Sequence, residues 1–230
     1  MVLLEEIDTP KQTAPEPVKP ESSAEPTVES QVKSSEDTTT AEPTKFSPEE
    51  EAKLLAESDS IKLEGNALFA SLDFDGAIAK YNTALATCPA YLDKPVAVLH
   101  SNVSACHAKK QEWTECVEAC TRALAKDSKY LKPLLRRAHA NEQIASWSSL
   151  SAAQEDYKLA HEIAPTRETA LALVRVGPLI EAAQKRETAE MMGKLKELGN
   201  GILKPFGLST DMFKMQPDEK GGYSMSFSKN

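Results

Sequence analysis

The sequence of 230 residues predicts an all-α protein, in which three pairs of helices stack into a solenoid and a C-terminal helix covers the last pair. Two observations lead to this prediction. Hydrophobic residues make up 40% of the chain but aromatic residues only 6%, and the mean hydropathy is −0.42, which suits an alanine-rich helical protein better than a β-sandwich. Small residues also recur at a fixed spacing in three segments of about 34 residues, a period that is typical of helical repeats.

Charge and cysteine content bound the class of protein. The formal net charge of −8 argues against general affinity for nucleic acid or for anionic membranes. No apolar run approaches the roughly 20 residues that cross a bilayer, and Met1–Leu4 is too short for the core of a secretion signal. The cysteines have no zinc-ligand spacing, which favours buried thiols in a reducing compartment; they are Cys88, Cys106, Cys116 and Cys120. We therefore expect a cytoplasmic protein with no nucleic-acid or membrane partner.

Residues 1–46 are expected to be a disordered acidic leader. They contain few large apolar groups, and their ten acidic residues against four lysines carry −6 of the total charge. Such a segment cannot bury enough apolar surface to offset the entropy of ordering it. The folded region is expected to begin at Ser47, because Ser47, Pro48 and Glu50 form the pattern of an N-cap, a first-turn proline and a capping box.

The first repeat shows the helix-pair pattern most clearly. With Gly65 as position 8, the residues at positions 20, 24, 27 and 32 are Ala77, Tyr81, Ala84 and Pro89. Small residues at positions 8, 20 and 27 let two antiparallel helices approach, the aromatic fills the space between them, and the proline ends the second helix. This pattern resembles the tetratricopeptide repeat family, which implies an all-α tetratricopeptide helical solenoid.

Two further repeats follow, so that the solenoid spans residues 47–165. The second starts at Ala97, with Ser104, Cys116, Cys120 and Ala123 at positions 8, 20, 24 and 27. The third starts at Leu131, with Ala138, Ala153, Tyr157, Ala160 and Pro165 in the matching places if three extra residues are allowed. We expect these three in the loop 145–149, and about five more near 90–96, because solenoids tolerate insertions between helices.

Five polar residues fall at the positions that a carboxylate-clamp branch of this family uses: Lys62, Asn66, Asn102, Lys132 and Arg136. Cations supply charge to a pair of carboxylates, and the two amides supply neutral donors that fix their orientation. The resemblance implies a co-chaperone or adaptor that binds the C-terminal Glu-Glu-Val-Asp of cytosolic heat-shock protein 70 and 90 chaperones. Phe69 is a further candidate for contact within the groove.

Residues 166–198 are expected to be helical and to cap the last repeat. Gly177 and Pro178 predict a break into a short and a long helix. Met191 and Met192 are interpreted as core packing.

The C-terminal tail, residues 199–230, contains Gly-Asn, Pro-Phe-Gly-Leu-Ser-Thr and Gly-Tyr-Ser elements that resemble one branch of the same family, and the resemblance covers residues 47–230. Alternating apolar residues predict a small β-hairpin of 211–216 against 222–228. The alternative function is that of a scaffold whose tail binds a client or a small GTPase. The candidate tail recognition residues are Phe206, Leu208, Phe213, Tyr223 and Phe227.

Motifs of catalysis are not found in the sequence. It contains no P-loop, no G-x-S-x-G, no H-E-x-x-H and no G-x-G-x-x-G. No carboxylate arrangement accompanies the four histidines, which are His100, His107, His139 and His161. We therefore expect a protein that is not an enzyme and that needs no cofactor or metal.

Overall fold

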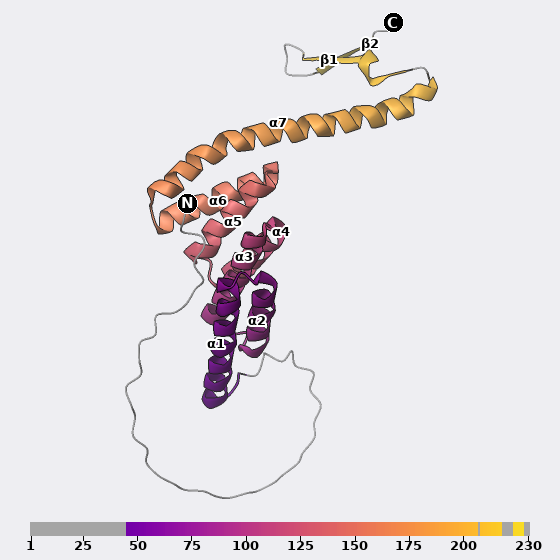
Figure 1. Ribbon diagram of the computed structural model, residues 1–230. Helices are drawn as coiled ribbons and strands as arrows, with labels where there is room; N and C mark the ends of the chain where they lie inside the picture. The colour runs from indigo at the N-terminus through magenta and orange to yellow at the C-terminus, as the bar shows by residue number, and fades with distance from the viewer. Residues whose placement is uncertain (1–44, 207, 218–222, 228–230) are drawn as a thin grey trace, which may run out of the picture.

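The computed structural model describes residues 45–206, 208–217 and 223–227. In this part of the chain, three antiparallel helix pairs stack on one another, and a long seventh helix lies across the last pair and projects beyond it (Figure 1). The paired helices are α1 Pro48–Ala70, α2 Phe74–Thr87, α3 Asp93–Lys110, α4 Trp113–Lys126, α5 Leu131–Ile144 and α6 Trp147–Ile163. The leader expected at residues 1–46 lies almost wholly outside the described residues, so its disorder stays a prediction.

Helix α1 begins as the sequence predicts. The Ser47 hydroxyl accepts a hydrogen bond from the Glu50 amide at 3.3 Å, and the Glu50 carboxylate accepts one from the Ser47 amide at 3.1 Å. This capping box satisfies two backbone donors that have no partner inside the helix. Hydrogen bonds from the Ser47 hydroxyl and amide hold the pKa of the Glu50 carboxyl below its usual value, so the carboxylate that caps the helix is the charged form.

The three helix pairs turn at the same place in the repeat. Leu72, Gln111 and Ala145 are the described non-glycine residues with positive φ, at 67°, 60° and 56°. Each is position 15 of its repeat when the repeats start at residues 58, 97 and 131. Gln111 and Ala145 directly follow the first helix of a pair, and Leu72 follows α1 after the C-cap Ser71. The left-handed residue ends that helix and reverses the chain. This shared backbone feature confirms the repeat register that the small residues predict.

Gly65 and Tyr81 show why a small residue is needed at position 8. A Cβ atom built on Gly65 would lie 2.7 Å from Cε1 of Tyr81, which is closer than carbon atoms can pack. Tyr81 is fully buried with Ala77 and Ala84, so its ring fills the space between α1 and α2. The predicted packing of a small residue against the aromatic residue is confirmed in this repeat.

The residues inserted beyond the 34-residue repeat length lie in different places from those expected. Only Ala145 and Ser146 connect α5 to α6, because Ser146 caps α6 and accepts from the Ser149 amide at 3.1 Å. The three extra residues therefore form an additional first turn of α6 and are not a loop. Similarly, residues 93–96 extend the start of α3, so that 88–92 alone separate α2 from α3.

Helix α7 spans Arg167–Leu203 without interruption, so the predicted break at Gly177 and Pro178 is wrong. A proline inside a helix leaves the carbonyl four residues earlier without its amide donor. That carbonyl belongs to Val174, which is 75% exposed and can be hydrated. Contacts on both sides of Pro178 hold the helix together: Arg175 pairs with Glu142 at 2.8 Å, and Arg186 donates to the Ala145 carbonyl at 2.9 Å.

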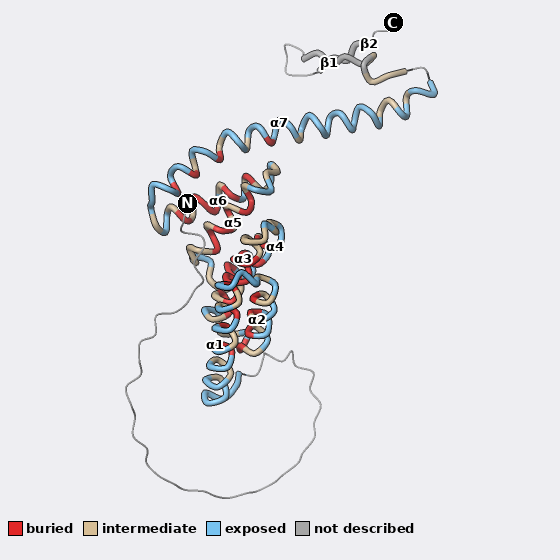
Figure 2. The backbone as a smooth tube through the Cα atoms, viewed as in Figure 1, coloured by how far each residue is buried: buried red, intermediate tan, exposed pale blue. Residues whose placement is uncertain are grey.

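The buried part of the molecule ends before α7 does (Figure 2). Ala172 and Val176 are buried in a cluster with residues of α5 and α6, and Ala183 is 2% exposed, whereas Met191 and Met192 are 69% and 60% exposed. The interpretation of the methionine pair as core packing is therefore wrong, because the helix has already passed the end of the repeats at that point.

Two short strands follow α7 and two 3₁₀ turns, η1 Lys204–Phe206 and η2 Thr210–Met212. Strand β1 Phe213–Pro217 pairs antiparallel with β2 Tyr223–Phe227, with Phe213 opposite Phe227 and Pro217 opposite Tyr223. The predicted hairpin is present, but Asp211 and Met212 belong to η2, and Pro217 is the last strand residue rather than part of the turn. The described helices include none that is both long and apolar enough to cross a membrane.

Candidate functional site

The five candidate clamp residues (Lys62, Asn66, Asn102, Lys132 and Arg136) lie on the first helices of the three pairs, α1, α3 and α5. Hydrogen bonds join these helices in sequence. Asn102 Nδ2 on α3 donates to Asn66 Oδ1 on α1 at 3.5 Å, and Arg136 on α5 donates to the Ser101 carbonyl on α3 at 2.9 Å. The structure thus brings the two asparagines together and places Arg136 against the helix turn that carries Asn102.

The two polar atoms of the Asn66 side-chain amide differ in their hydrogen bonding. Its Oδ1 accepts a hydrogen bond from the Tyr81 hydroxyl at 2.8 Å, and burial raises the pKa of Tyr81, so the phenol keeps the proton that it donates. The Asn66 Nδ2 atom is buried and has no hydrogen-bond partner among the described residues. A buried donor without an acceptor costs about 1–3 kcal/mol, so this amide favours a ligand that brings an acceptor.

Lys62 is buried on α1, and its ammonium contacts a carboxylate of the same helix. Lys62 Nζ lies 2.6 Å from Asp59 Oδ1, one helical turn earlier. The lysine side chain is 8% exposed and the aspartate side chain 50% exposed, so the carboxylate is the more accessible of the pair.

Arg136 is 2% exposed and ties α5 to α3. Its Nη1 donates to the Ser101 carbonyl at 2.9 Å, to Ser101 Oγ at 3.2 Å and to Ser104 Oγ at 2.9 Å. These acceptors are neutral oxygens of α3. Arg136 therefore places its guanidinium against the turn of α3 that carries Asn102.

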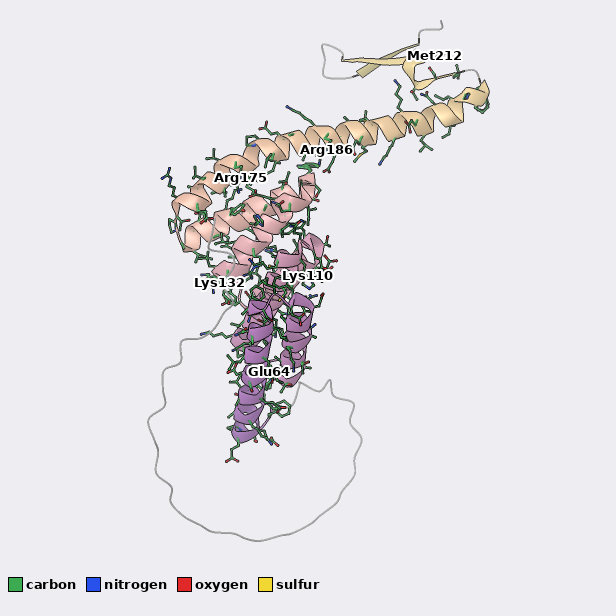
Figure 3. The ribbon with its side chains drawn as sticks, in the orientation of Figure 1. Glu64, Lys110, Lys132, Arg175, Arg186 and Met212 are labelled. Atoms are coloured by element: carbon green, nitrogen blue, oxygen red, sulfur yellow. The ribbon has the colours of Figure 1, made fainter. Side chains whose placement is uncertain are left out.

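Lys132 lies one turn before Arg136, at the edge of a pocket of about 290 Å³ between α5, α6 and α7. Figure 3 shows Lys132 on α5 and Arg175 on α7, which are two of the charged residues that line this pocket. Leu135, Tyr157 and Ala172 give it mostly apolar walls. A pocket of this kind suits an apolar side chain that is attached to a charged group held by Lys132.

Other charged residues of α5 have a structural role. Arg137 makes a bidentate pair with the buried carboxylate of Asp156 on α6, at 2.8 and 2.7 Å, and this pairing raises the pKa of the guanidinium. Glu142 pairs with Arg175 of α7 in the same bidentate manner. These pairs fix α6 and α7 against α5 and so hold the walls of the pocket in place.

The remaining candidate residues are less favourably placed. Phe69 is 8% exposed and packs edge-on against Phe74 at 5.4 Å, so it belongs to the core and offers little surface to a ligand. Phe206 is 75% exposed and Leu208 is partly exposed. For Phe213, Tyr223 and Phe227 the structure describes the strands but not the side chains.

The described residues show no sign of a metal site, and their cysteines form no disulfide. They contain no group of three or more potential metal ligands among His, Cys, Asp and Glu. All four cysteines are free and buried, as the sequence predicts, and burial raises the pKa of the Cys106 thiol to about 12. A thiol with such a pKa is unreactive near neutral pH.

Sequence reasoning missed the residues that support the candidate clamp. Asp59 could have been found from its spacing, because residues three apart on a helix are neighbours. The Ser101-x-x-Ser104 pair that receives Arg136 had no signal of its own, since serine on a helix usually faces water or bonds its own backbone.

Comparison with known proteins supports the fold. No family model matches the chain. Sperm-associated antigen 1A of Danio rerio is 40% identical over 106 residues, which is 45% of this chain and 24% of that protein. Among solved structures, the C-terminal TPR-containing domain of a Plasmodium falciparum protein is 19% identical and covers 59% of this chain and 95% of that domain, with a TM-score of 0.51. The folded region of this chain therefore has the fold of a tetratricopeptide-repeat solenoid.

The tetratricopeptide likeness covers the repeats rather than whole proteins, since the chain spans a quarter or less of the curated relatives that it matches. The first such domain of Spaghetti (RPAP3), bound to the HSP90 peptide SRMEEVD, is 22% identical, with a TM-score of 0.47 over 54% of this chain and 93% of that domain. In the solenoid of this chain, α1, α3 and α5 are the first helices of the three repeats and carry the candidate clamp residues.

Proposed function

We propose that α1, α3 and α5 form a groove that binds the free C-terminus of a partner protein through a dicarboxylate clamp. The partners would be heat-shock protein 70 and 90 chaperones, which end in Glu-Glu-Val-Asp, and the protein would be a cytoplasmic co-chaperone or adaptor rather than an enzyme. The SRMEEVD peptide named for Spaghetti (RPAP3) describes that protein and serves here as a probe.

The observation that carries the proposal is the buried Asn66 Nδ2, which has no acceptor among the described residues. It lies next to Asn102, which is 1% exposed, and Arg136 contacts the same turn of α3. A carboxylate oxygen is an acceptor only and carries negative charge, so it would satisfy the amide and the nearby cations together. A neutral or cationic group would not.

The residues would divide the two carboxylates of a terminal aspartate between them. Lys62, Asn66 and Asn102 would hold the main-chain carboxylate, and Lys132 and Arg136 the side-chain carboxylate. The apolar pocket beside Lys132 would then accept an apolar side chain of the same peptide. The groove would distinguish a free C-terminus from an internal segment of a protein, because only a free C-terminus carries a main-chain carboxylate.

The test is calorimetry with SRMEEVD and with the same peptide amidated at its C-terminus. We expect micromolar affinity for the free acid, near −8 kcal/mol, and severe loss for the amide. Asn102→Ala should weaken binding at least tenfold, since a donor to the carboxylate is lost. Lys80→Ala is the matched control, because Lys80 is an exposed lysine of α2 that pairs with Glu64. Equal affinity for the free and amidated peptides would exclude the clamp.

The tail gives a second candidate function. Its sequence elements resemble those of tetratricopeptide repeat protein 1 and its eukaryotic homologues, and Phe206 exposes 75% of its surface at the end of α7. On this basis the tail would bind a client or a small GTPase. Loss of chaperone-independent partners from pull-downs with Phe206→Ala, with peptide affinity unchanged, would support this role.

A further inference from the structure

The Lys62 ammonium is occupied by a carboxylate of its own helix. Asp59 Oδ1 lies 2.6 Å from Lys62 Nζ, and this is the hydrogen bond that the described residues provide to that ammonium. The lysine side chain is 8% exposed while the aspartate is 50% exposed, so a ligand from solvent reaches the ammonium past the Asp59 carboxylate. The position that a peptide carboxylate would take at Lys62 is therefore already taken by a group of the same chemistry.

The repeat register places Asp59 on the face of the candidate clamp. Asp59 is position 2 of the first repeat, and Lys132 is position 2 of the third. Position 2 of the repeat therefore holds an acidic residue in the first repeat and a basic residue in the third. Asp59 therefore places a negative charge within the set of candidate clamp residues, next to Lys62.

We infer that Asp59 is an internal competitor that sets the affinity of the clamp for C-terminal carboxylates. This inference rests on the proposed function. A bound peptide would share or displace the Asp59–Lys62 contact and would remain near the aspartate charge. The repulsion opposes binding of the main-chain carboxylate at Lys62 and leaves the other end of the peptide unaffected.

The size of the effect follows from Coulomb's law. Two unit charges about 5 Å apart, in surroundings close to bulk water with an effective dielectric constant of about 50–80, interact strongly enough to change a dissociation constant by about three- to tenfold. Asp59→Asn removes the charge but keeps an oxygen that can accept from Lys62. We therefore expect this variant to bind SRMEEVD about three- to tenfold more tightly than the native chain.

Glu64→Gln is the matched control. Glu64 is an exposed acid of the same helix, 54% exposed in its side chain, and it pairs with Lys80 of α2. The substitution removes the same charge from α1 but leaves the Asp59–Lys62 contact intact. Affinity for the peptide should change by less than about twofold, because the Glu64 charge is already paired and is screened by solvent.

The experiment is a two-by-two comparison of full-length native and Asp59→Asn proteins with free-acid and amidated SRMEEVD. Calorimetry measures the free acid, and NMR titration measures the weaker amide. The gain from Asp59→Asn should appear with the free acid and be less than about twofold with the amide, because the amide has no terminal charge to repel. Melting curves confirm that both proteins are folded.

The outcomes separate this inference from the proposed function. If the native chain binds neither peptide, the proposed function fails. If the native chain binds the free acid but Asp59→Asn leaves its affinity unchanged or weakens it, Asp59 positions Lys62 and does not compete, and the inference is wrong. An equal gain in affinity for the amidated peptide, or an equal gain in the Glu64→Gln variant, would also overturn the inference. Either result would mean that the lower negative charge of the protein, and not the Asp59–Lys62 contact, strengthens binding.

Discussion

Arg136 of α5 donates a hydrogen bond to Ser104 Oγ of α3 at 2.9 Å, while both side chains are buried. Ser104 is position 8 of the second repeat, the place that Gly65 occupies in the first. A residue that the repeat pattern selects for small size therefore also receives the guanidinium of a candidate clamp residue. Packing of the solenoid and the charge of the clamp are coupled at this point.

Arg136→Ala should reduce both stability and peptide binding. The substitution removes hydrogen bonds to Ser101 and Ser104 in a buried place, which costs about 2–3 kcal/mol and lowers the melting temperature by several degrees. Ser104→Ala is the control, because it removes one of these bonds but keeps the charge. It should cost less stability, and the affinity for SRMEEVD should change little. If both variants lost affinity for SRMEEVD at a temperature where both are folded, the charge of Arg136 would not be what binds the peptide.

Gly65→Ala should destabilise the first repeat, although alanine favours helix over glycine by about 1 kcal/mol. The new Cβ would lie 2.7 Å from the buried Tyr81 ring, and relieving this overlap costs about 1–3 kcal/mol. Tyr81 also holds Asn66, so peptide binding should weaken in parallel. Gly177→Ala is the matched control, since a Cβ there meets no atom within 4 Å. Gly177→Ala should raise the melting temperature. If Gly65→Ala and Gly177→Ala lowered the melting temperature by similar amounts, the steric explanation would be wrong.

The sequence predicts the structure best where a local geometry requires a particular type of residue. The Ser47 capping box and the packing of Gly65 against Tyr81 each follow from a rule about neighbours in a repeat, and both are confirmed. Pro178 was misjudged because the cost of a helical proline depends on whether the freed carbonyl meets water, which a sequence does not show. Met191 was misjudged because periodicity predicts a helix but not where its packing partner ends.

The candidate clamp was predicted only as a set of positions. Register placed Asn66 and Asn102 on neighbouring helices, and the structure brings them to 3.5 Å. The burial of Arg136 against Ser101 depends on the close stacking of α3 and α5, which involves residues 35 apart in the chain. Single-sequence reasoning has no access to such contacts, so the partners of the clamp residues emerged only from the structure.

Pro178→Ala should stabilise the protein. Pro178 is exposed and lies within the continuous helix α7, where alanine would restore the amide donor to the Val174 carbonyl. Proline in a helix interior costs about 3 kcal/mol relative to alanine, and hydration of the exposed carbonyl recovers part of it, so a gain of about 1–2 kcal/mol is expected. Thermal unfolding measures the gain. A lower melting temperature would mean that the proline defines a bend that the packing of α7 requires.

Truncations of α7 should locate the end of the cap. A chain that ends after Leu203 loses η1, η2 and the hairpin. Of these, η1 and η2 contact α7, as where the Thr210 amide donates to Asn200 Oδ1 at 2.6 Å. A chain that ends after Glu187 also loses the exposed end of the helix but keeps the Glu187 carboxylate on the Trp147 amide at 2.7 Å. Both should melt within a few degrees of the full chain and bind SRMEEVD normally.

A chain that ends after Gly177 should differ from both, because it loses groups that pack on the last repeat. Ala183 is 2% exposed, Ile180 packs against the buried cluster around Tyr157, and Arg186 donates to the Ala145 carbonyl. Exposing these groups should cost about 2–4 kcal/mol and lower the melting temperature by roughly 5–15 °C. Peptide binding should persist at low temperature, since the clamp residues lie on α1, α3 and α5. A large loss of stability already after Leu203 would show that the tail, and not the first half of α7, closes the solenoid.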